Sequence, residues 1–279
     1  MSSQPVGGKE FCRIFTTMEK SYALITGASQ GLGKAFVLEL AKRNINTILV
    51  SLPGEGLEYI ASQVEAQGLE AHCYETDLTL KENIVALANW VNERFPLSIL
   101  INNAGCGGTQ SFSNVSVDYL DRIIQLNVKA TSLLTHQLLP NLVRQKSAYV
   151  LNVGSVAAYS PIGYKTVYPA SKAFVHSFTR GLYQEFADSN VFFSVVNPGP
   201  MMTNPDSSSR LQQQGRFATM GLLSPEQVAA ISIRQLFRRD TLIMLNWVNR
   251  LTWMVMKFLP IYIRLPLLTH AIKKEINRA

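Results

Sequence analysis

Short apolar segments alternate with longer amphipathic ones along most of this chain. The apolar segments are nearly continuous, as is typical of strands that helices cover on both faces. They predict seven strands, at residues 22–26, 47–51, 70–75, 98–102, 148–153, 191–196 and 241–245. The amphipathic segments predict helices near residues 32–43, 55–67, 79–94, 116–139, 167–187 and 225–238. This alternation predicts a doubly wound, mostly parallel α/β sheet of the Rossmann type.

The predicted sheet and its helices form a single domain at residues 20–245, because a chain of 279 residues usually holds one core. A polar leader at 1–19 precedes it and is expected to be poorly ordered, and Met18 is a second candidate start. An apolar, basic helical extension follows at 246–279. The segment 200–224 is rich in Ser and Gln and is expected to be a substrate loop, with a surface insertion as the alternative.

Charge is distributed unevenly along the chain. The net charge is +7, but residues 1–233 hold 17 Lys and Arg against 17 Asp and Glu, and residues 234–279 hold nine against two. The positive excess therefore belongs to the C-terminal segment and not to the predicted domain. Nucleic acid is not a predicted partner, because these basic residues are interleaved with large aliphatic ones and match no nucleic-acid-binding motif.

The three cysteines, Cys12, Cys73 and Cys106, are far apart in the sequence. Their spacing matches neither a metal site nor a disulfide framework, so no metal ligand is predicted. The N-terminal residues lack the apolar stretch of a signal peptide. Together these features favour a reducing, cytoplasmic compartment.

A glycine-rich turn follows the first predicted strand. Gly27, Gly31 and Gly33 lie just before and within the start of the next helix. Glycine lets the backbone approach a ligand, and a helix N-terminus offers free N–H groups to a phosphate. The spacing G-x-x-x-G-x-G differs from the G-x-G-x-x-G of many dinucleotide sites, and tight packing is the alternative. Its place after the first strand of an α/β sheet favours a nucleotide site.

The residues after the second and third strands bear on which nucleotide binds. An acidic residue at the end of the second strand normally binds the adenosine ribose hydroxyls of NAD and repels a 2′-phosphate. Here that position is Ser51. This favours NADP(H), although no Arg or Lys follows directly and NAD(H) stays compatible. Asp77, after the third strand, is expected either to reach the adenine edge or to cap the next helix.

Polar residues also follow the fourth and fifth strands. The fourth ends in the small residues Asn102-Asn103-Ala104-Gly105, and Ser155 follows the fifth. Tyr168 and Lys172 come next and, being four residues apart, share one face of a predicted helix. Such a pair is common on solvated helices, so its meaning depends on the residues that accompany it.

In their order and spacing, these residues resemble the short-chain dehydrogenase/reductase family. The resemblance covers roughly residues 20–245. The matching features are T-G-x-x-x-G-x-G at 26–33, N-N-A-G at 102–105, Asn127 in the fourth long helix, Ser155, Tyr168-x-x-x-Lys172, and Pro198-Gly199 with Thr203 beyond.

The resemblance implies an NAD(P)(H)-dependent oxidoreductase that interconverts a carbonyl and an alcohol, and it assigns roles to four residues. Tyr168 would be the general acid or base, helped by the Lys172 ammonium, which is expected to lower the pKa of the phenol. Lys172 would also bind the nicotinamide ribose. Ser155 would donate a hydrogen bond to the substrate oxygen, and Asn127 would hold a water that relays protons.

The cofactor is expected to contact the residues that surround the glycine turn and the strand ends. These are Gly27, Ser29, Gln30, Gly31, Leu32, Gly33, Ser51, Asp77, Leu78, Asn103, Ala104, Gly105, Tyr168, Lys172, Pro198, Gly199 and Thr203.

The residues expected to surround the substrate are almost all uncharged. They are Cys106, Gly107, Val156, Ala157, Tyr159, Ile162, Met201 and Met202. They disfavour a polyanionic substrate group near the reacting carbon. The apolar, basic C-terminal segment resembles that of reductases that act on long acyl chains or steroids, and this resemblance implies a ketone reductase for an apolar substrate such as an acyl chain or a steroid-like compound. The alternatives are a reductase of small ketones or sugars, and a non-enzymatic dinucleotide sensor, which would not need Ser155, Tyr168 and Lys172.

The extension at 246–279 contains a predicted amphipathic helix at 246–259. Its apolar stretches are too short to span a membrane, and Pro260 and Pro266 are expected to break any continuous helix. One interpretation is a helix that lies in a membrane interface, with Arg250 and Lys257 on its polar stripe. The other is a helix packed over the substrate cleft or against another subunit, because the family's members are commonly dimers or tetramers.

Overall fold

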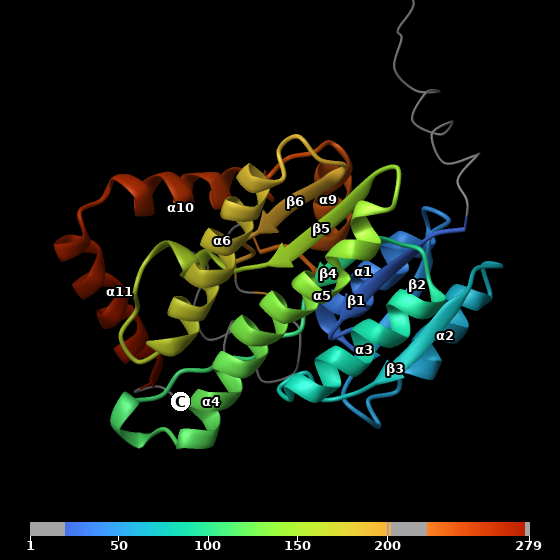
Figure 1. The fold of residues 1–279 in the computed structure, drawn as a ribbon. Coiled ribbons are helices and arrows are strands. Elements are labelled where there is room, and N and C mark those ends of the chain that lie inside the picture. Colours follow the sequence, from blue (N-terminus) through green and yellow to red (C-terminus); the bar gives the residue numbers. More distant parts are fainter. Residues whose placement is uncertain (1–19, 200, 202–221, 277–279) are drawn as a thin grey trace, which may run out of the picture.

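The computed structural model describes residues 20–199, 201 and 222–276. Its centre is one sheet of seven strands in the order β3-β2-β1-β4-β5-β6-β7 (Figure 1). All adjacent strands pair in parallel, which confirms the predicted Rossmann-type sheet. The strands are β1 (Tyr22–Thr26), β2 (Asn46–Ser51), β3 (Ala71–Glu75), β4 (Leu97–Asn102), β5 (Ala148–Val153), β6 (Val191–Val196) and β7 (Leu242–Ile243).

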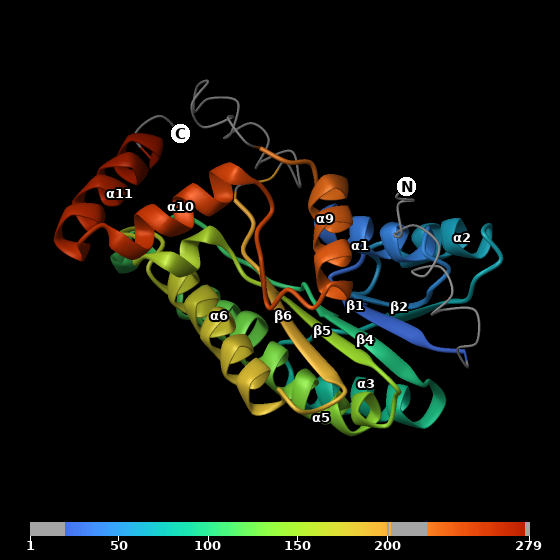
Figure 2. The same cartoon turned by 90° about the horizontal axis from the view of Figure 1, so that it is seen from above.

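Helices cover both faces of the sheet (Figure 2). On one face lie α1 (Gly31–Ala41), α2 (Leu57–Glu65) and α9 (Pro225–Phe237), and on the other α3 (Lys81–Arg94), α5 (Thr131–Val143) and α6 (Val167–Glu185). One hydrophobic cluster fills each interface, and Phe36 and Phe193 are among their largest fully buried side chains. Strands that are buried on both faces must be apolar throughout, which explains why the sequence predicted them well.

The strand order reverses between β1 and β4, and this reversal positions the functional site. From β1 the chain moves outward to β2 and β3, then returns to place β4 on the other side of β1. The turns that leave β1 and β4 therefore diverge and leave a crevice at the carboxyl ends of the strands. Ligands of open α/β sheets bind at such a point.

The fourth long helix differs from the uniform helix predicted at 116–139. It consists of α4 (Val117–Ile124), a π-helical segment η2 (Gln125–Ala130) and α5. A π-helical segment has wider turns than an α-helix and occurs frequently at functional sites. Asn127 lies within this segment, so the irregularity falls at a residue that the sequence assigned to the site.

The last strand and the C-terminal extension also differ from the predictions. β7 has only two residues, because just Leu242 and Ile243 pair with β6 at the edge of the sheet. The extension forms α10 (Trp247–Phe258) and α11 (Ile261–Ile276). Pro260 separates the two helices as predicted, but the expectation that Pro266 would break the helix is wrong, since it lies inside α11. A proline removes one helical hydrogen bond, here to the carbonyl of the exposed Tyr262, which solvent can hydrate.

Candidate active site

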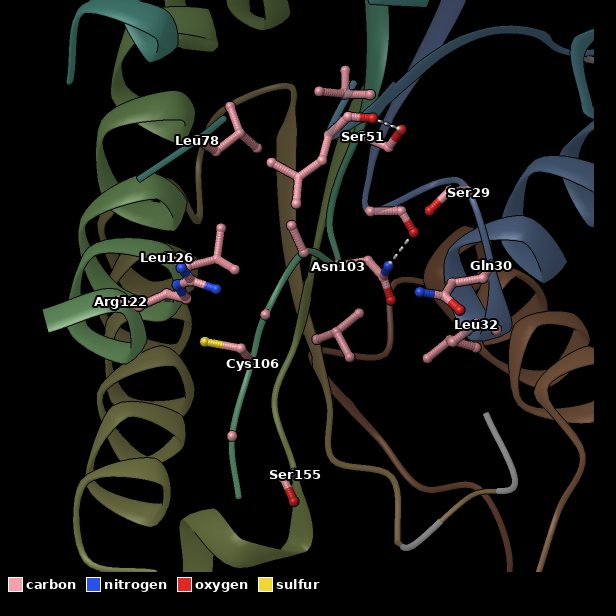
Figure 3. A pocket seen from close by; sticks show the side chains of 18 of the residues that line it. Ser29, Gln30, Leu32, Ser51, Leu78, Asn103, Cys106, Arg122, Leu126 and Ser155 are labelled. Carbon is pink, nitrogen blue, oxygen red and sulfur yellow. Dashed lines mark hydrogen bonds between the residues drawn. The ribbon is translucent and has the colours of Figure 1, made fainter. Parts of the chain in front are cut away.

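A cleft of about 690 Å³ opens at the carboxyl ends of the strands. Its lining comes from the turns after β1 to β6, and Figure 3 shows Ser51 and Ser155 toward opposite ends of it. Sixteen of the residues expected at the site line this one cleft. They are Gly27, Ser29, Gln30, Gly31, Leu32, Ser51, Asp77, Leu78, Asn103, Ala104, Gly105, Ser155, Tyr168, Lys172, Pro198 and Gly199.

The glycine-rich turn is shaped to receive a phosphate group. Helix α1 begins at Gly31, and its N-cap residue Gln30 makes no side-chain capping hydrogen bond. The first-turn N–H groups and the positive end of the helix dipole therefore remain available to an anion. Gly33 does not line the cleft; a Cβ there would lie 1.8 Å from the carbonyl oxygen of Gly27, so the close approach of the helix to the turn requires glycine.

The turns after β1 and β4 are joined by side-chain hydrogen bonds. Asn103 donates from Nδ2 to the carbonyl oxygens of Thr26 (2.9 Å) and Gly27 (3.1 Å). In return, the Thr26 hydroxyl accepts from the backbone N–H groups of Asn103 and Ala104, both at 3.0 Å. These contacts give the cleft a floor with a fixed shape.

One end of the cleft carries an acidic residue that sequence reasoning missed. Glu55 lines the cleft near Ser51, and its carboxylate accepts a 2.6 Å hydrogen bond from the Ser29 hydroxyl in the glycine turn. Its sequence signal was an acid shortly after β2, displaced by four residues from the usual position. Asp77 also lines the cleft, and its Oδ1 accepts from the backbone of Thr79 at 2.9 Å. The alternative that Asp77 caps the next helix is wrong, since the N-cap of α3 is Leu80 and no side chain caps that helix. A contact of Asp77 with the adenine edge stays a prediction.

Lys172 is buried without a carboxylate partner among the described residues. It is 5% exposed, and its Nζ donates to the carbonyl oxygen of Val153 at 2.9 Å. Burial disfavours the charged form and lowers the pKa of Lys172 to about 8. A lysine held in this way exchanges protons much more readily near neutral pH than a solvated one does.

Tyr168 and Ser155 meet at the base of the cleft. The Ser155 hydroxyl hydrogen-bonds Tyr168, and the Lys172 Nζ lies 5.9 Å from the Tyr168 ring centroid. The sequence predicted that the ammonium lowers the pKa of the phenol. Instead, burial raises the pKa of Tyr168, and the hydrogen bond from Ser155 opposes that shift only in part. Gly107 makes room for the ring, since a Cβ at that position would lie 2.3 Å from Tyr168 Cδ2.

Asn127 lies behind the cleft and holds the turn that precedes Gly107. Its Oδ1 accepts from the Cys106 N–H, and its Nδ2 donates to the Cys106 carbonyl and to the Ser171 hydroxyl, each at 2.9 Å. A Cβ on Gly105 would lie 3.0 Å from Asn127 Oδ1 and 3.2 Å from Lys172 Nζ, so both side chains approach the backbone of Gly105 closely. The side chain of Asn127 therefore positions Cys106, which lines the cleft.

Buried asparagines at the ends of three strands support the turns that line the cleft, a role that the sequence did not predict. Asn102 Nδ2 donates to Asn152 Oδ1 at 2.8 Å, and Asn152 Nδ2 donates to the Thr179 hydroxyl of α6 at 2.8 Å. Asn197 Oδ1 accepts from the backbone N–H of Ser155 at 3.0 Å, which fixes the start of the Ser155 turn. Their signal was weak: a single Asn that ends or follows a buried strand.

The substrate side of the cleft is only partly as predicted. Cys106, Gly107 and Met201 line the cleft, whereas the other candidates in the described chain do not: Val156, Ala157, Tyr159 and Ile162. Met202 and Thr203 lie outside the described residues. Arg122 lines the cleft beside Cys106 and Leu126, one turn before Asn127, and was missed (Figure 3).

The doubly wound parallel sheet, with a glycine-rich turn at its switch point, defines a domain of the Rossmann type. A family model described as short chain dehydrogenase matches residues 21–214, which is more than half of the chain. The chain belongs to the short-chain dehydrogenase family, as the sequence motifs predicted.

Particular relatives show how broad this similarity is. The chain is 32% identical over 204 residues to hydroxysteroid dehydrogenase-like protein 1 of Gallus gallus, covering 70% of this chain and 60% of the relative. It is 30% identical to a very-long-chain 3-oxoacyl-CoA reductase of Anas platyrhynchos, covering 68% and 62%. The chain thus spans less than two thirds of the length of these two relatives. An uncharacterized oxidoreductase of Staphylococcus epidermidis is 30% identical, and 85% of that protein is covered.

Solved structures show the same fold. A short-chain dehydrogenase from Sphingobium yanoikuyae in complex with NADPH superposes with a TM-score of 0.74 at 25% identity, covering 85% of this chain and 92% of that one. A family member from Burkholderia phymatum in complex with NAD gives 0.75 at 23% identity, covering 85% and 94%. The same fold therefore occurs in one protein solved with NADPH and in another solved with NAD.

Proposed function

We propose that this chain uses a nicotinamide dinucleotide to interconvert a carbonyl and an alcohol, and that it acts as a reductase of an apolar ketone. The observation that carries the proposal is the pairing of the Ser155 and Tyr168 hydroxyls beside a buried Lys172, in the same cleft as an uncapped, glycine-rich helix N-terminus. A site that only binds a nucleotide would need the glycine-rich helix N-terminus but not the paired hydroxyls of Ser155 and Tyr168.

The residues divide the work as follows. The cofactor, when bound, supplies or accepts the hydride. The hydroxyls of Ser155 and Tyr168 donate hydrogen bonds to the substrate oxygen, and Tyr168 transfers its proton there during reduction. A raised pKa suits this direction, because it keeps the phenol protonated. Lys172 would bind the nicotinamide ribose, and Asn127 acts as a positioning residue through Cys106. The relay water expected at Asn127 stays a prediction.

An apolar substrate fits the neutral residues at the reacting end. Cys106, Gly107 and Met201 carry no formal charge, and burial raises the pKa of the Cys106 thiol further. Two relatives bear names that refer to hydroxysteroids and very long acyl chains, which supports the same class. A small ketone or a sugar is the competing substrate class, and Arg122 is the observation in its favour, since it adds a cation to the cleft.

The choice between the two cofactors rests on opposing features. Ser51, in place of a carboxylate at the end of β2, favours NADP(H), which is the preference predicted from the sequence. Glu55 opposes it, because its carboxylate lines the same part of the cleft as Ser51 and would repel the negative charge of a 2′-phosphate bound there. NADP(H) therefore stays a prediction that a titration with both cofactors decides.

Assembly and compartment also belong to the proposal. Members of the family are commonly dimers or tetramers, which favours a homo-oligomer. Cys73 and Cys106 are free thiols among the described residues, in keeping with the reducing cytoplasm that we predict. Cys12 lies outside the described residues.

The test is oxidation of NADPH and NADH, followed by absorbance, with a panel of carbonyl compounds that includes 3-oxoacyl thioesters, ketosteroids, small ketones and sugars. We expect turnover with the apolar members and its loss in Tyr168→Phe, while cofactor binding, followed by fluorescence, survives. Full activity in Tyr168→Phe would refute the assignment. Cofactor binding without turnover of any compound would instead favour a dinucleotide sensor.

A further inference from the structure

Helix α10 presents an apolar face to solvent. Its members lie at the spacing of one helix face, i, i+4, i+7, i+8 and i+11. They are Trp247 (64% exposed), Leu251 (47%), Met254 (38%), Val255 (43%) and Phe258 (75%). We call these five residues the α10 apolar face. A helix that only completed the core would turn such a face inward.

The opposite side of α10 holds the helix to the domain and fixes its orientation. Asn249 is 6% exposed, and its Nδ2 donates to the carbonyl oxygen of Asn197 at 2.9 Å. Asn246 caps the helix by accepting from the Asn249 backbone at 2.8 Å. The side toward η3 (Val156–Tyr159) is thus anchored by polar contacts, so the apolar face points outward because of how the helix is attached.

Helix α11 extends the same kind of surface. Ile261, Tyr262, Ile263 and Leu267 are 48%, 74%, 41% and 61% exposed. Arg264 ties this helix inward by donating to the carbonyl oxygens of Tyr159 and Met256. Figures 1 and 2 show α10 and α11 together at the end of the molecule beside α6, away from α2. The two helices therefore form an exposed projection at one end of the domain.

Cations accompany the apolar side chains. Arg250 and Lys257 are exposed on α10, and the Lys257 Nζ lies 5.1 Å from the Trp253 ring centroid. In the sequence, residues 246–279 hold six Lys or Arg and one Glu. Pairing this surface with a second copy of itself would bring like charges together. An anionic lipid surface instead offers phosphate groups to the cations and acyl chains to the apolar face.

We propose that α10 and α11 dock this protein on an anionic lipid bilayer through the α10 apolar face, at the boundary between headgroups and acyl chains. Trp247 and Tyr262 are amphipathic aromatic residues of the kind that prefer this boundary. The docking is peripheral, since no helix in the described ranges is long and apolar enough to cross a bilayer. This inference stands on surface chemistry and is independent of the catalytic proposal.

Docking in this orientation has a consequence for the substrate, and that consequence does rest on the proposed function. Helix α10 packs on η3, which directly follows Ser155. Helix α11 reaches the chain ahead of Tyr168, where a Cβ on Gly163 would lie 2.9 Å from Thr269 and where the Lys273 Nζ lies 5.7 Å from the Tyr164 ring centroid. The bilayer would therefore lie on the outer side of α10 and α11, so that these helices separate an apolar ketone in the bilayer from the segment that joins Ser155 to Tyr168.

The test is co-sedimentation of the full chain with vesicles of phosphatidylcholine alone or mixed with phosphatidylserine. One variant, Trp247→Ala with Phe258→Ala, weakens the apolar face, and another, Arg250→Gln with Lys257→Gln, weakens its charge. The control is Tyr59→Ala with Val117→Ala, which removes equally exposed apolar side chains elsewhere (69% and 81% exposed). Circular dichroism and analytical ultracentrifugation report the fold and the oligomeric state of each protein.

We expect the full chain and the control to bind phosphatidylserine vesicles. The charge variant should lower the partition constant about 30-fold, and the apolar variant about 100-fold. Binding that is equal for the apolar variant and the unaltered chain would overturn the proposal. So would failure of the unaltered chain to bind either vesicle. If the apolar variant only splits an oligomer, the face is a subunit interface and the proposal is wrong; loss of turnover with intact vesicle binding would affect the catalytic proposal alone.

Discussion

Replacing Lys172 with Met should stabilise the protein near neutral pH while it abolishes turnover. Met has a similar length and no charge, so it can occupy the same buried channel beside the Val153 carbonyl. What it removes is an ammonium that is 5% exposed and has no carboxylate partner among the described residues. The variant separates the demands of catalysis from those of folding, because one side chain affects both in opposite directions.

The magnitude follows from the pKa of Lys172. Burial lowers this pKa from 10.5 to about 8, so the unfolded chain binds the proton more tightly than the folded one. Below the folded pKa the penalty on folding is complete, about 3 kcal/mol. It falls as pH rises from 8 toward 10.5 and is only about 1 kcal/mol at about pH 10. Met avoids this penalty but gives up the hydrogen bond to Val153, which contributes about 1 kcal/mol.

The variant should therefore be more stable than the unaltered protein by about 2 kcal/mol at about pH 7, and equally stable at about pH 10. Urea unfolding of the cofactor-free proteins, followed by circular dichroism across this range, measures the difference. Lys146→Met, on an exposed loop, is the matched control and should show no such trend. A stability difference that does not change with pH would refute the reasoning, because it would mean that Lys172 is not desolvated in the folded protein.

Two further substitutions test the cleft from its two ends. Glu55→Gln should shift the ratio of NADPH to NADH affinity about tenfold toward NADPH, while the distant Glu93→Gln should leave it unchanged. Fluorescence titration of both cofactors measures the ratio. No shift would mean that Glu55 does not lie near the 2′-position of the cofactor. Gly107→Ala should lower kcat about 100-fold with little effect on cofactor binding, because the new Cβ displaces the Tyr168 ring. The control is Gly181→Ala, where a Cβ meets nothing within 4 Å, and it should keep full activity. Steady-state kinetics that give equal kcat for both variants would contradict the contact between position 107 and the Tyr168 ring.

The sequence predicted the sheet and most of the cleft because both depend on local patterns. A strand buried on both faces must be apolar along its length, and a nucleotide turn needs glycine at fixed positions. Asn103 directly follows a predicted strand, and Tyr168 and Lys172 lie on a predicted helix. Their place in one cleft could be predicted once the strands were known to be parallel, since their carboxyl ends then share one edge.

The features that the sequence did not predict arise from contacts between distant segments. Glu55 matters because its loop folds back onto Ser29, 26 residues earlier. Asn197 matters because it meets the backbone of Ser155, 42 residues earlier. The pKa of Tyr168 is likewise raised by the packing of distant segments around it, since burial raises this pKa more than the hydrogen bond from Ser155 lowers it. The local sequence pattern around a residue does not show which distant residues it contacts in the fold.

Two features of this protein work against its stability, and both support the function that we propose. The domain keeps a desolvated ammonium at Lys172, and it leaves large apolar side chains such as Trp247 and Phe258 in water. A dinucleotide sensor could use the first to bind the nicotinamide ribose, but it would not need Tyr168 and Ser155 beside it, because binding requires no proton donor. A free-standing reductase of small polar ketones would gain nothing from the second. The enzyme that we propose, which reduces an apolar ketone at a lipid surface, would use both: the ammonium lies beside Tyr168, and the apolar face would hold the protein on the bilayer.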